Sequence, residues 1–399
     1  MSKKLVQINV TCNGSTGRIM QQLQETAIAN GFEAVSFYGR GEPGKTGKYI
    51  RIGNDFDVKT HGVVTRIFDK HGHASVNATK KMIEQIEKIN PDVIQLHNLH
   101  GYYLNLKILF NYLKKSKAKK IWTLHDCWAF TGHCSYFTMA KCDKWKEGCY
   151  DCPQKKEYPK SIFIDNSKEE YEFKKNLFNG IEDLTIVTPS EWLANLVKQS
   201  FLSRYPIKVI NNGIDLNIFR PVDGSEMREK LKISKEKKIV LGVASIWEKR
   251  KGFKYFLDLS QILENNEIIV LVGLNKRQIK NLPQNIIGIE RTENINELVE
   301  LYSMSDVFFN PSYEETFSLV TIEAVACGLP VLVFDSSAVT EIVNRESGKI
   351  LNNYDINNVK KSINDIIYSG KYKDKHIINM QSKNYEIKLK CDEYIKLYS

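Results

Sequence analysis

Short apolar runs alternate with longer amphipathic stretches along the whole chain. In the first half, the apolar runs lie at 5–10, 34–39, 92–98, 120–126 and 184–190. The stretches between them repeat apolar residues at helical spacing, as at 18–30, 76–89 and 103–115. Because strands that are buried on both faces are almost continuously apolar, this pattern predicts a parallel sheet with helices on both sides.

The same alternation restarts after an irregular segment at 206–221, which contains an Asn-Gly pair and ends in a proline. Further apolar runs predict a second parallel sheet, at 238–245, 268–273, 285–290, 306–311 and 330–335. A chain of 399 residues is long enough for two domains. We therefore expect two doubly wound α/β domains, at 1–205 and 206–379.

Composition places the chain among soluble globular proteins, with 42% hydrophobic and 26% charged residues. No run of eighteen apolar residues predicts a transmembrane helix, and the start "MSKKLVQINV" lacks the apolar core of a signal peptide. We expect a cytoplasmic protein with reduced thiols. The net charge of +10 and the lysine run at 112–120 suit nucleic acid, anionic lipid or a phosphorylated substrate, or simply a solvated helix end.

Loops that follow parallel strands are the expected ligand sites. In "NGSTGR" (13–18), Gly14 and Gly17 permit a tight turn that exposes amides to an anion, unless Ser15 or Thr16 simply caps the next helix. The segment is neither a dinucleotide fingerprint nor a P-loop. It is equally compatible with a structural turn.

A second loop, at 244–253, carries two adjacent cations. Arg250 and Lys251 precede Gly252 and a predicted helix. A guanidinium and an ammonium together suit a diphosphate, and an exposed basic turn is the alternative.

The third loop lies at 311–331 and leads into a predicted helix at 318–327. Glu315 belongs to the loop, and Glu323 lies inside the otherwise apolar helix. A buried carboxylate needs a partner, which a ribose diol or a basic side chain would supply. The helix N-terminus at 317–320 would offer free amides to phosphate.

His125 ends an apolar strand and is followed by Asp126. At the carboxyl end of a parallel strand a histidine is placed for a role in the site, although a histidine there can also be purely structural.

Five of the eight cysteines lie between residues 127 and 152. They belong to a segment, 127–165, that breaks the α/β pattern and reads as an insertion. The spacing of Cys134, Cys142, Cys149 and Cys152 ends in a C-x2-C pair and predicts a structural zinc site, in which Cys127 or His133 could replace one ligand. Packed free thiols or disulfides are the alternatives.

Several motifs together resemble glycosyltransferase family 4, a family of retaining enzymes. They are Glu315 and Glu323 within "EETFSLVTIEAVACGLPV", the Lys-Gly pair at 251–252, "VINNGIDLNIFRP" and "SSAVTEIV", which contains Glu341. The segment that begins "HDCWAFTGHCSYF" resembles a subgroup that builds bacterial capsular, exopolysaccharide or colanic-acid-type glycans.

The resemblance implies a GT-B fold, in which two Rossmann-like domains face a cleft and a C-terminal helix, here 380–399, returns to the N-terminal, acceptor-side domain. It implies a hexosyltransferase (EC 2.4) that moves a sugar from a UDP- or GDP-sugar to a growing, lipid-linked surface polysaccharide with retention. The nucleotide sugar is a substrate, no catalytic metal is expected, and the protein would contact the inner face of the cell membrane peripherally.

The resemblance also implies roles for single residues. Glu323 would bind the ribose, Glu315 the donor sugar, and His125 the sugar or the acceptor. Arg250 and Lys251 would hold the diphosphate, while Gly14 and Gly17 border the donor. Backbone amides would assist at Phe317, Ser318 and Leu319. Where the family often has Glu-Gly-Phe-Gly, this chain has Glu-Thr-Phe-Ser, which leaves the donor less room.

Two other functions fit parts of the sequence. A related GT-B enzyme would epimerise or hydrolyse a nucleotide sugar. A zinc-containing nucleic-acid-binding protein would use the cysteines and the basic charge, but needs no second sheet.

Overall fold

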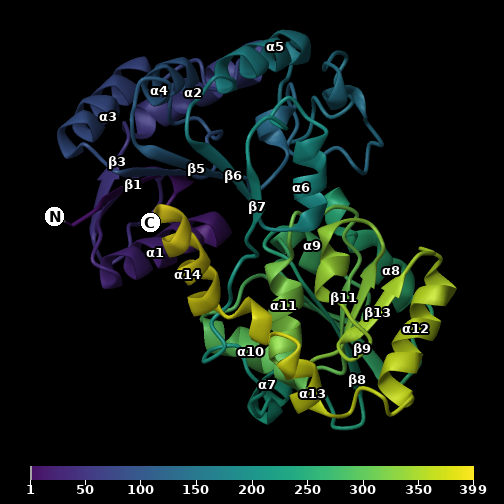
Figure 1. Ribbon diagram of the computed structural model, residues 1–399. Coiled ribbons are helices and arrows are strands. Elements are labelled where there is room, and N and C mark those ends of the chain that lie inside the picture. The colour runs from purple at the N-terminus through teal and green to yellow at the C-terminus, as the bar shows by residue number, and fades with distance from the viewer. Residues whose placement is uncertain (1) are drawn as a thin grey trace. The chain divides into compact units, whose positions relative to one another are not determined.

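The computed structural model describes residues 2–399 and divides the chain into two α/β units (Figure 1). The first unit is the chain up to Asn211 together with Lys390–Ser399. The second unit is Asn212–Leu389.

The first unit is built on a seven-stranded sheet with the order β3-β2-β1-β4-β5-β6-β7. All of its strand pairs are parallel. The strands are β1 (Lys4–Thr11), β2 (Glu33–Arg40), β3 (Lys48–Arg51), β4 (Val93–Leu96), β5 (Lys119–Thr123), β6 (Leu184–Thr188) and β7 (Ile207–Val209).

Helices cover both faces of this sheet, with α1 and α14 on one side and α2 to α5 on the other (Figure 1). They are α1 (Gly14–Ala29), α2 (Asp55–Phe68), α3 (Val76–Ile89), α4 (Leu106–Leu113), α5 (Ser167–Phe178), α6 (Glu191–Lys198) and α14 (Ile387–Tyr398). The end of α14 is fixed to the sheet by two side-chain contacts. The hydroxyls of Tyr394 and Thr123 are 3.0 Å apart, and the Tyr398 hydroxyl donates to Gln95 Oε1 at 3.2 Å.

The second unit has a six-stranded sheet with the order β10-β9-β8-β11-β12-β13, again with parallel pairs only. Its strands are β8 (Lys238–Val243), β9 (Glu267–Val272), β10 (Ile286–Ile289), β11 (Val307–Asn310), β12 (Val331–Phe334) and β13 (Gly348–Leu351). Its helices are α7 (Ser225–Lys230), α8 (Phe253–Ser260), α9 (Lys276–Lys280), α10 (Ile295–Met304), α11 (Leu319–Ala326), α12 (Ile356–Tyr368) and α13 (Lys375–Met380), with short 3-10 turns at η3 (Lys249–Lys251), η4 (Ala338–Ile342) and η5 (Lys383–Tyr385).

The predicted fold class, two doubly wound parallel α/β sheets, is confirmed, while several edge strands were missed. The segment 206–221 is not wholly irregular, because Ile207–Val209 forms the edge strand β7. β3 was also missed. Both strands are short, and none of their residues is buried, so their sequences lack the continuous apolar run of an interior strand.

The cysteine-rich segment (residues 127–165) contains little regular structure. Its only helical turns are η1 (Trp128–Phe130) and η2 (Lys144–Lys146), both of the 3-10 type. It follows the carboxyl end of β5, and its buried side chains join the core of the first unit.

Candidate active site

In the second unit, the loops after β8 and β11 meet through an ion pair. Lys251 Nζ donates to Glu315 Oε1, and the two side chains are only 16% and 12% exposed. Burial lowers the pKa of Lys251, because desolvation disfavours the ammonium, while the Glu315 carboxylate opposes that shift. Two predicted site residues are thus brought together.

The turn that carries Lys251 requires glycine at the next position. Gly252 has a φ of +73°, and a Cβ there would lie 2.3 Å from the carbonyl oxygen of Pro311. Only glycine allows the backbone of this turn to approach the β11 loop so closely. The Lys251–Glu315 pair depends on that approach.

Arg250 is tied to the same loop by its guanidinium. Its Nη1 donates to the carbonyl oxygen of Glu314 at 3.1 Å, and its Nε donates to Glu248 Oε2 at 3.1 Å. The structure therefore places Arg250 beside Lys251 and against residues that precede α11.

The N-terminus of α11 has no side-chain cap. Ser318 is the N-cap residue, but its side chain makes no capping hydrogen bond. Its hydroxyl instead accepts from Asn310 Nδ2 at 3.1 Å and from Thr321 Oγ1 at 2.9 Å. A helix N-terminus without a side-chain cap carries partial positive charge and suits an anion. Of the three predicted amide donors, Leu319 is the first residue of this helix, and Phe317 and Ser318 directly precede it.

Glu323 lies within α11 and is 5% exposed. The hydroxyl of Tyr302 donates to its Oε2 at 3.1 Å. Tyr302 was missed by the sequence analysis, because its role follows from the packing of α10 against α11 and leaves no local motif. The ribose contact predicted for Glu323 stays a prediction.

In the first unit, His125 is part of a chain of neutral histidines. His97 Nδ1 and His125 Nε2 are 3.2 Å apart, and His97 Nε2 is 3.3 Å from Gln7 Oε1. Burial lowers the pKa of His125 to about 4 and that of His97 well below its usual value. Because the Gln7 oxygen can only accept, His97 Nε2 carries a proton, and His97 Nδ1 accepts from His125 Nε2. This assignment leaves His125 Nδ1 as an acceptor.

A further histidine, His100, lies beside this chain and contacts Asp126 and Tyr158. His100 Nε2 is 2.8 Å from Asp126 Oδ2, and His100 Nδ1 is 3.1 Å from the hydroxyl of Tyr158. The sequence analysis missed both His97 and His100. Their signal was "LHNLH", which places two histidines directly after an apolar strand.

The helix that follows the glycine-rich loop, α1, is capped by neither Ser15 nor Thr16. α1 begins at Gly14, with Asn13 at the N-cap and no side-chain capping bond, so the alternative in which Ser15 or Thr16 caps the helix is wrong. Gly17 is required for packing, because a Cβ there would lie 2.3 Å from the carbonyl carbon of Cys12. Gly14 is exposed, with no other group within 4 Å of the position of its Cβ.

The predicted zinc ligands are free thiols. Cys134 and Cys152 hydrogen-bond to each other, and the backbone amide of Gly132 donates to Cys149 Sγ at 3.1 Å. In the part of the chain that the structure describes, the only three potential ligand atoms that all lie within 4.8 Å of one another belong to Asp69, His71 and His133. Cys134 and Cys152 are therefore neighbours, but the four cysteines do not form a closed metal site.

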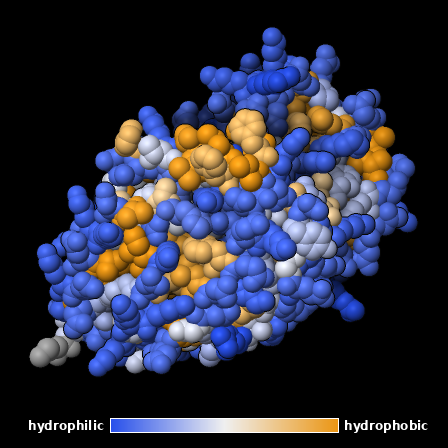
Figure 2. Space-filling view, turned by 90° about the horizontal axis from the view of Figure 1, so that it is seen from above, coloured by the Kyte–Doolittle hydropathy of each residue, from blue (hydrophilic) through white to orange (hydrophobic). Residues whose placement is uncertain are grey.

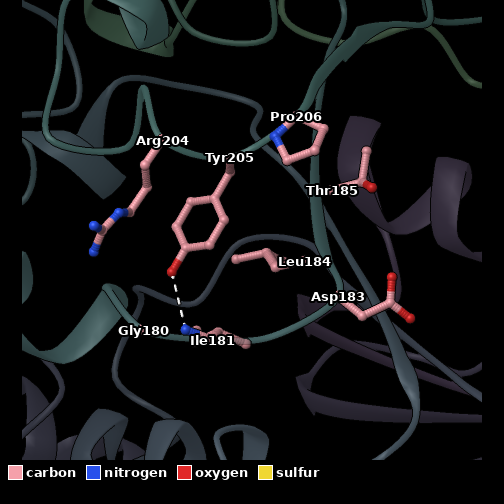
Figure 3. A pocket seen from close by; sticks show the side chains of 8 residues that line it. All are labelled: Gly180, Ile181, Asp183, Leu184, Thr185, Arg204, Tyr205 and Pro206. Carbon is pink, nitrogen blue, oxygen red and sulfur yellow. Dashed lines mark hydrogen bonds between the residues drawn. The ribbon is translucent and has the colours of Figure 1, made fainter.

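A pocket of about 430 Å³ lies elsewhere in the first unit (Figure 3). Its lining includes Leu184, at the start of β6, and Pro206, just before β7, so it opens at the amino ends of these strands. Inside it, the backbone amide of Ile181 donates to the Tyr205 hydroxyl at 3.2 Å. None of the predicted site residues lines this pocket, and the carboxyl ends of the strands lie at the opposite edge of the sheet.

Two family models match the chain. Residues 16–218 match the model described as "Glycosyltransferase Family 4", and residues 223–383 match "Glycosyl transferases group 1". Together they cover both α/β units.

Curated relatives include two glycosyltransferases of Escherichia coli. The chain is 24% identical over 371 residues to the "Putative colanic acid biosynthesis glycosyl transferase WcaC" of Escherichia coli K12, covering 88% of each chain. It is 26% identical over 203 residues to an Escherichia coli UDP-Gal:alpha-D-GlcNAc-diphosphoundecaprenol alpha-1,3-galactosyltransferase, covering 47% of this chain and 50% of the relative.

Solved structures share the fold over nearly the whole chain. Sucrose-phosphate synthase from Thermosynechococcus elongatus has a TM-score of 0.71 at 18% identity and covers 99% of this chain and 98% of its own. Anabaena HepE in complex with UDP and glucose has a TM-score of 0.67 at 14% identity and covers 99% of both chains. These similarities show a GT-B fold of two Rossmann-like domains.

Proposed function

Since the chain belongs to glycosyltransferase family 4, we propose that it transfers a hexose from a nucleoside-diphosphate sugar to a growing, lipid-linked surface polysaccharide, with retention of configuration. The observation that carries the donor half is the Lys251–Glu315 pair together with the uncapped N-terminus of α11. Fixed cations and helix amides stabilise negative charge on a departing diphosphate without having to reorganise.

The donor roles follow the chemistry of each group. Lys251 and Arg250 would hold the diphosphate, with the amides at 317–319. Glu323 would accept hydrogen bonds from the ribose, and Glu315 would accept them from the hexose while it orients Lys251. No catalytic metal is required, because these groups already supply positive charge.

The acceptor half rests on the first unit. His125, with its Nδ1 as an acceptor, would meet a hydroxyl of the sugar or the acceptor, and Gly14 and Gly17 would border the donor. The galactosyltransferase relative is named for a diphosphoundecaprenol-linked acceptor, and HepE was solved with UDP and glucose. These names favour a UDP-sugar and a lipid-linked acceptor, and hence a cytoplasmic protein at the inner face of the membrane.

Contact with the membrane would be peripheral. Among residues 2–399, no helix is both long and apolar enough to cross a bilayer. The lysine run at 112–120 leads into the amino end of β5, away from His125, and its Lys120 is buried and donates to the carbonyl oxygen of Ser116 at 2.6 Å. This run therefore lies at the edge of the sheet opposite to His125.

A better surface lies on α2 and the adjoining part of the cysteine-rich segment. Ile162 N–H donates to the carbonyl oxygen of Arg66 at 2.8 Å, so the two elements lie side by side. The surface, which we call the α2 patch, comprises the exposed side chains of Phe56, Val63, Phe68, Ile162 and Phe163. The view onto the helices that are uppermost in Figure 1 shows hydrophobic patches set among hydrophilic side chains (Figure 2). Exposed Lys59, Lys156 and Lys160 would add attraction to anionic lipid.

The donor half is tested by thermal shift with UDP-, GDP- and ADP-sugars. A donor that binds only the folded protein raises its melting temperature, and we expect one nucleotide class to do so. Glu323→Gln should reduce that shift, whereas Glu236→Gln, an exposed residue of the same unit, should not. If Glu323→Gln binds donor like the parent, the predicted ribose contact is wrong.

The transfer step is tested with the stabilising donor and an undecaprenyl-diphosphate-linked sugar. We expect an extended lipid-linked product whose new linkage keeps the donor's anomeric configuration by NMR. Release of free nucleotide with an altered or free sugar, in the absence of any acceptor, would instead identify an epimerase or hydrolase.

The membrane contact is tested by sedimentation with anionic phospholipid vesicles. Phe163→Glu should weaken binding, while Ile377→Glu, an exposed apolar residue on α13, should not. Equal sedimentation of the two variants would contradict a role for the α2 patch.

A further inference from the structure

Tyr158 is an aromatic residue of the cysteine-rich segment whose two ends lie in different surroundings. The residue is 44% exposed. Its hydroxyl, however, lies 3.1 Å from Nδ1 of His100, which is buried. Burial raises the pKa of Tyr158, so the hydroxyl keeps its hydrogen at pH 7. The residue thus offers surface to solvent while its polar end is anchored in the protein.

The anchor is itself held in place by a buried carboxylate. His100 Nε2 lies 2.8 Å from Asp126 Oδ2, and Asp126 Oδ1 accepts from the backbone amide of Trp128 at 2.9 Å. The ring of Trp128 packs against His100, with ring centres 5.1 Å apart. Because a carboxylate can only accept, His100 Nε2 carries the hydrogen of the bond to Asp126. In its neutral form, His100 therefore accepts the hydroxyl hydrogen of Tyr158 at Nδ1.

This assignment determines what Tyr158 can offer to a ligand. A phenol oxygen that donates its hydrogen to a histidine can still accept a hydrogen bond from another hydroxyl. The bond to His100 also limits the movement of the ring, whose centre lies 5.6 Å from that of His100. An aromatic ring that is already fixed loses little conformational entropy when a ligand packs on it. Tyr158 is therefore a rigid apolar surface with one hydrogen-bond acceptor at its edge.

The group lies at the carboxyl edge of the first sheet, where ligands are expected. His100 belongs to the loop after β4 and Asp126 to the loop after β5, and these two strands are paired. Asp126 directly follows His125, the residue predicted to meet the sugar or the acceptor. Arg40, at the end of β2, reaches the same loop, because its Nη2 lies 3.2 Å from the position of a Cβ on Gly101, next to His100.

We propose that Tyr158 is the platform on which a sugar ring of the acceptor glycan packs, with His100 as the residue that positions it. This inference rests on the proposed function. A pyranose ring has a face of C–H groups that suits an aromatic ring, and its hydroxyls can donate to the Tyr158 oxygen. Arg40 adds N–H donors for the hydroxyl oxygens of the same ligand. The cysteine-rich segment thereby takes part in selecting the acceptor.

Contact with lipid is the competing role for an exposed aromatic residue in this segment. Ile162 and Phe163, which belong to the α2 patch, have wholly apolar side chains. Tyr158 differs, because its hydroxyl is bonded to a buried histidine that contacts Asp126. A tyrosine at a membrane surface instead keeps its polar tip in the wet interface. The direction of the Tyr158 hydroxyl therefore favours a carbohydrate ligand.

The test is the acceptor KM of the full chain in the transfer assay, with the stabilising donor at saturation and the undecaprenyl-diphosphate-linked sugar varied. Loss of the aromatic ring in Tyr158→Ala should raise this KM about tenfold. Tyr150→Ala is the matched control, because Tyr150 is 54% exposed in the same segment, and its KM should equal that of the parent. The donor groups lie in the second unit, so both variants should keep the donor-induced rise in melting temperature, which also shows that they are folded.

A double-mutant cycle tests the positioning role of His100. Tyr158→Phe keeps the ring and loses the anchored hydroxyl, so the acceptor KM should rise less than in Tyr158→Ala. His100→Gln keeps a donor for Asp126 but loses the acceptor for Tyr158, and should raise the KM to the same extent as Tyr158→Phe. The double variant should show no further rise, because both changes break one contact. Two effects that multiply would overturn the positioning role.

The remaining outcomes separate this inference from the function on which it rests. Transfer by Tyr158→Ala with the parental acceptor KM would overturn the platform and leave the proposed function standing. Weaker sedimentation of Tyr158→Ala with anionic vesicles that carry no glycan, together with that unchanged KM, would assign Tyr158 to the membrane. A parent protein that transfers no sugar to the lipid-linked acceptor would overturn the proposed function, and the platform with it.

Discussion

At the scale of single residues, the motifs predicted which groups carry chemistry but not what holds them. Lys251 and Glu315 were both predicted site residues, and the structure pairs them. The partners Tyr302 and Gln7 could not be predicted, because each reaches its contact from a different element of the fold. Sequence spacing specifies a side chain within its own loop, whereas its partner depends on how the elements pack.

Lys251→Ala should slow transfer without unfolding the protein. The variant removes a charge-assisted contact to the diphosphate that is worth about 1.5–3 kcal/mol, so we expect kcat to fall by roughly one to two orders of magnitude. Steady-state transfer rates measure the effect. Lys254→Ala removes a lysine that is 83% exposed and paired with Asp258, and should leave kcat unchanged. Equal rates for the two variants would place the diphosphate elsewhere.

At the scale of elements, the interior strands, the longer helices and the edge strand β10 could be predicted, whereas the edge strands β3, β7 and β13 could not. The predicted helix at 318–327 corresponds to α11 (Leu319–Ala326), whose apolar residues and closing Gly328 are visible in the sequence. β3 and β7 are short edge strands with little burial, so they carry a weak pattern. The close approach of Gly252 to Pro311 is likewise invisible without the fold.

Gly252→Ala should destabilise the second unit more than a matched glycine change. Gly370 has a similar φ of +78°, but the nearest group to its added Cβ is the end of the Lys373 side chain, at 3.6 Å. We therefore expect Gly370→Ala to cost about 1 kcal/mol for the left-handed backbone alone, and Gly252→Ala to cost more because it also displaces the Pro311 carbonyl. Urea unfolding of both variants gives the difference.

The rise in melting temperature on donor binding gives a second measurement for the same two variants. Gly252→Ala should weaken donor binding, because the turn positions Arg250 and Lys251, whereas Gly370→Ala should not. Equal free energies of unfolding for the two variants would show that the Pro311 carbonyl can be displaced at little energetic cost.

At the scale of the whole molecule, the titrating histidines are unevenly distributed. Seven of the eight belong to the first unit, and the exception, His376, is exposed on α13. Burial lowers the pKa values of His61, His71 and His125 to about 4 each. The two units should therefore respond differently to acid.

Acid should destabilise the first unit selectively. Unfolded histidines bind protons below about pH 6.5, while these folded ones do so only near pH 4, so their contribution is complete above pH 6.5 and is lost as the pH falls toward 4. Each group contributes up to about 3 kcal/mol. Hydrogen exchange at pH 7 and pH 5, corrected for intrinsic rates, should show protection lost mainly in the first unit. Equal loss in both units would contradict this assignment.

The last residues of the chain also bear on how the protein is made. Residues 390–399 belong to the first unit, where Tyr394 and Tyr398 contact Thr123 and Gln95. On the ribosome, this unit would emerge almost whole long before its final helix is translated. It must therefore wait, with the part of the sheet that Tyr394 and Tyr398 contact left uncovered, until the second unit has been synthesised. Synthesis of residues 390–399 is then the event that completes the domain begun first.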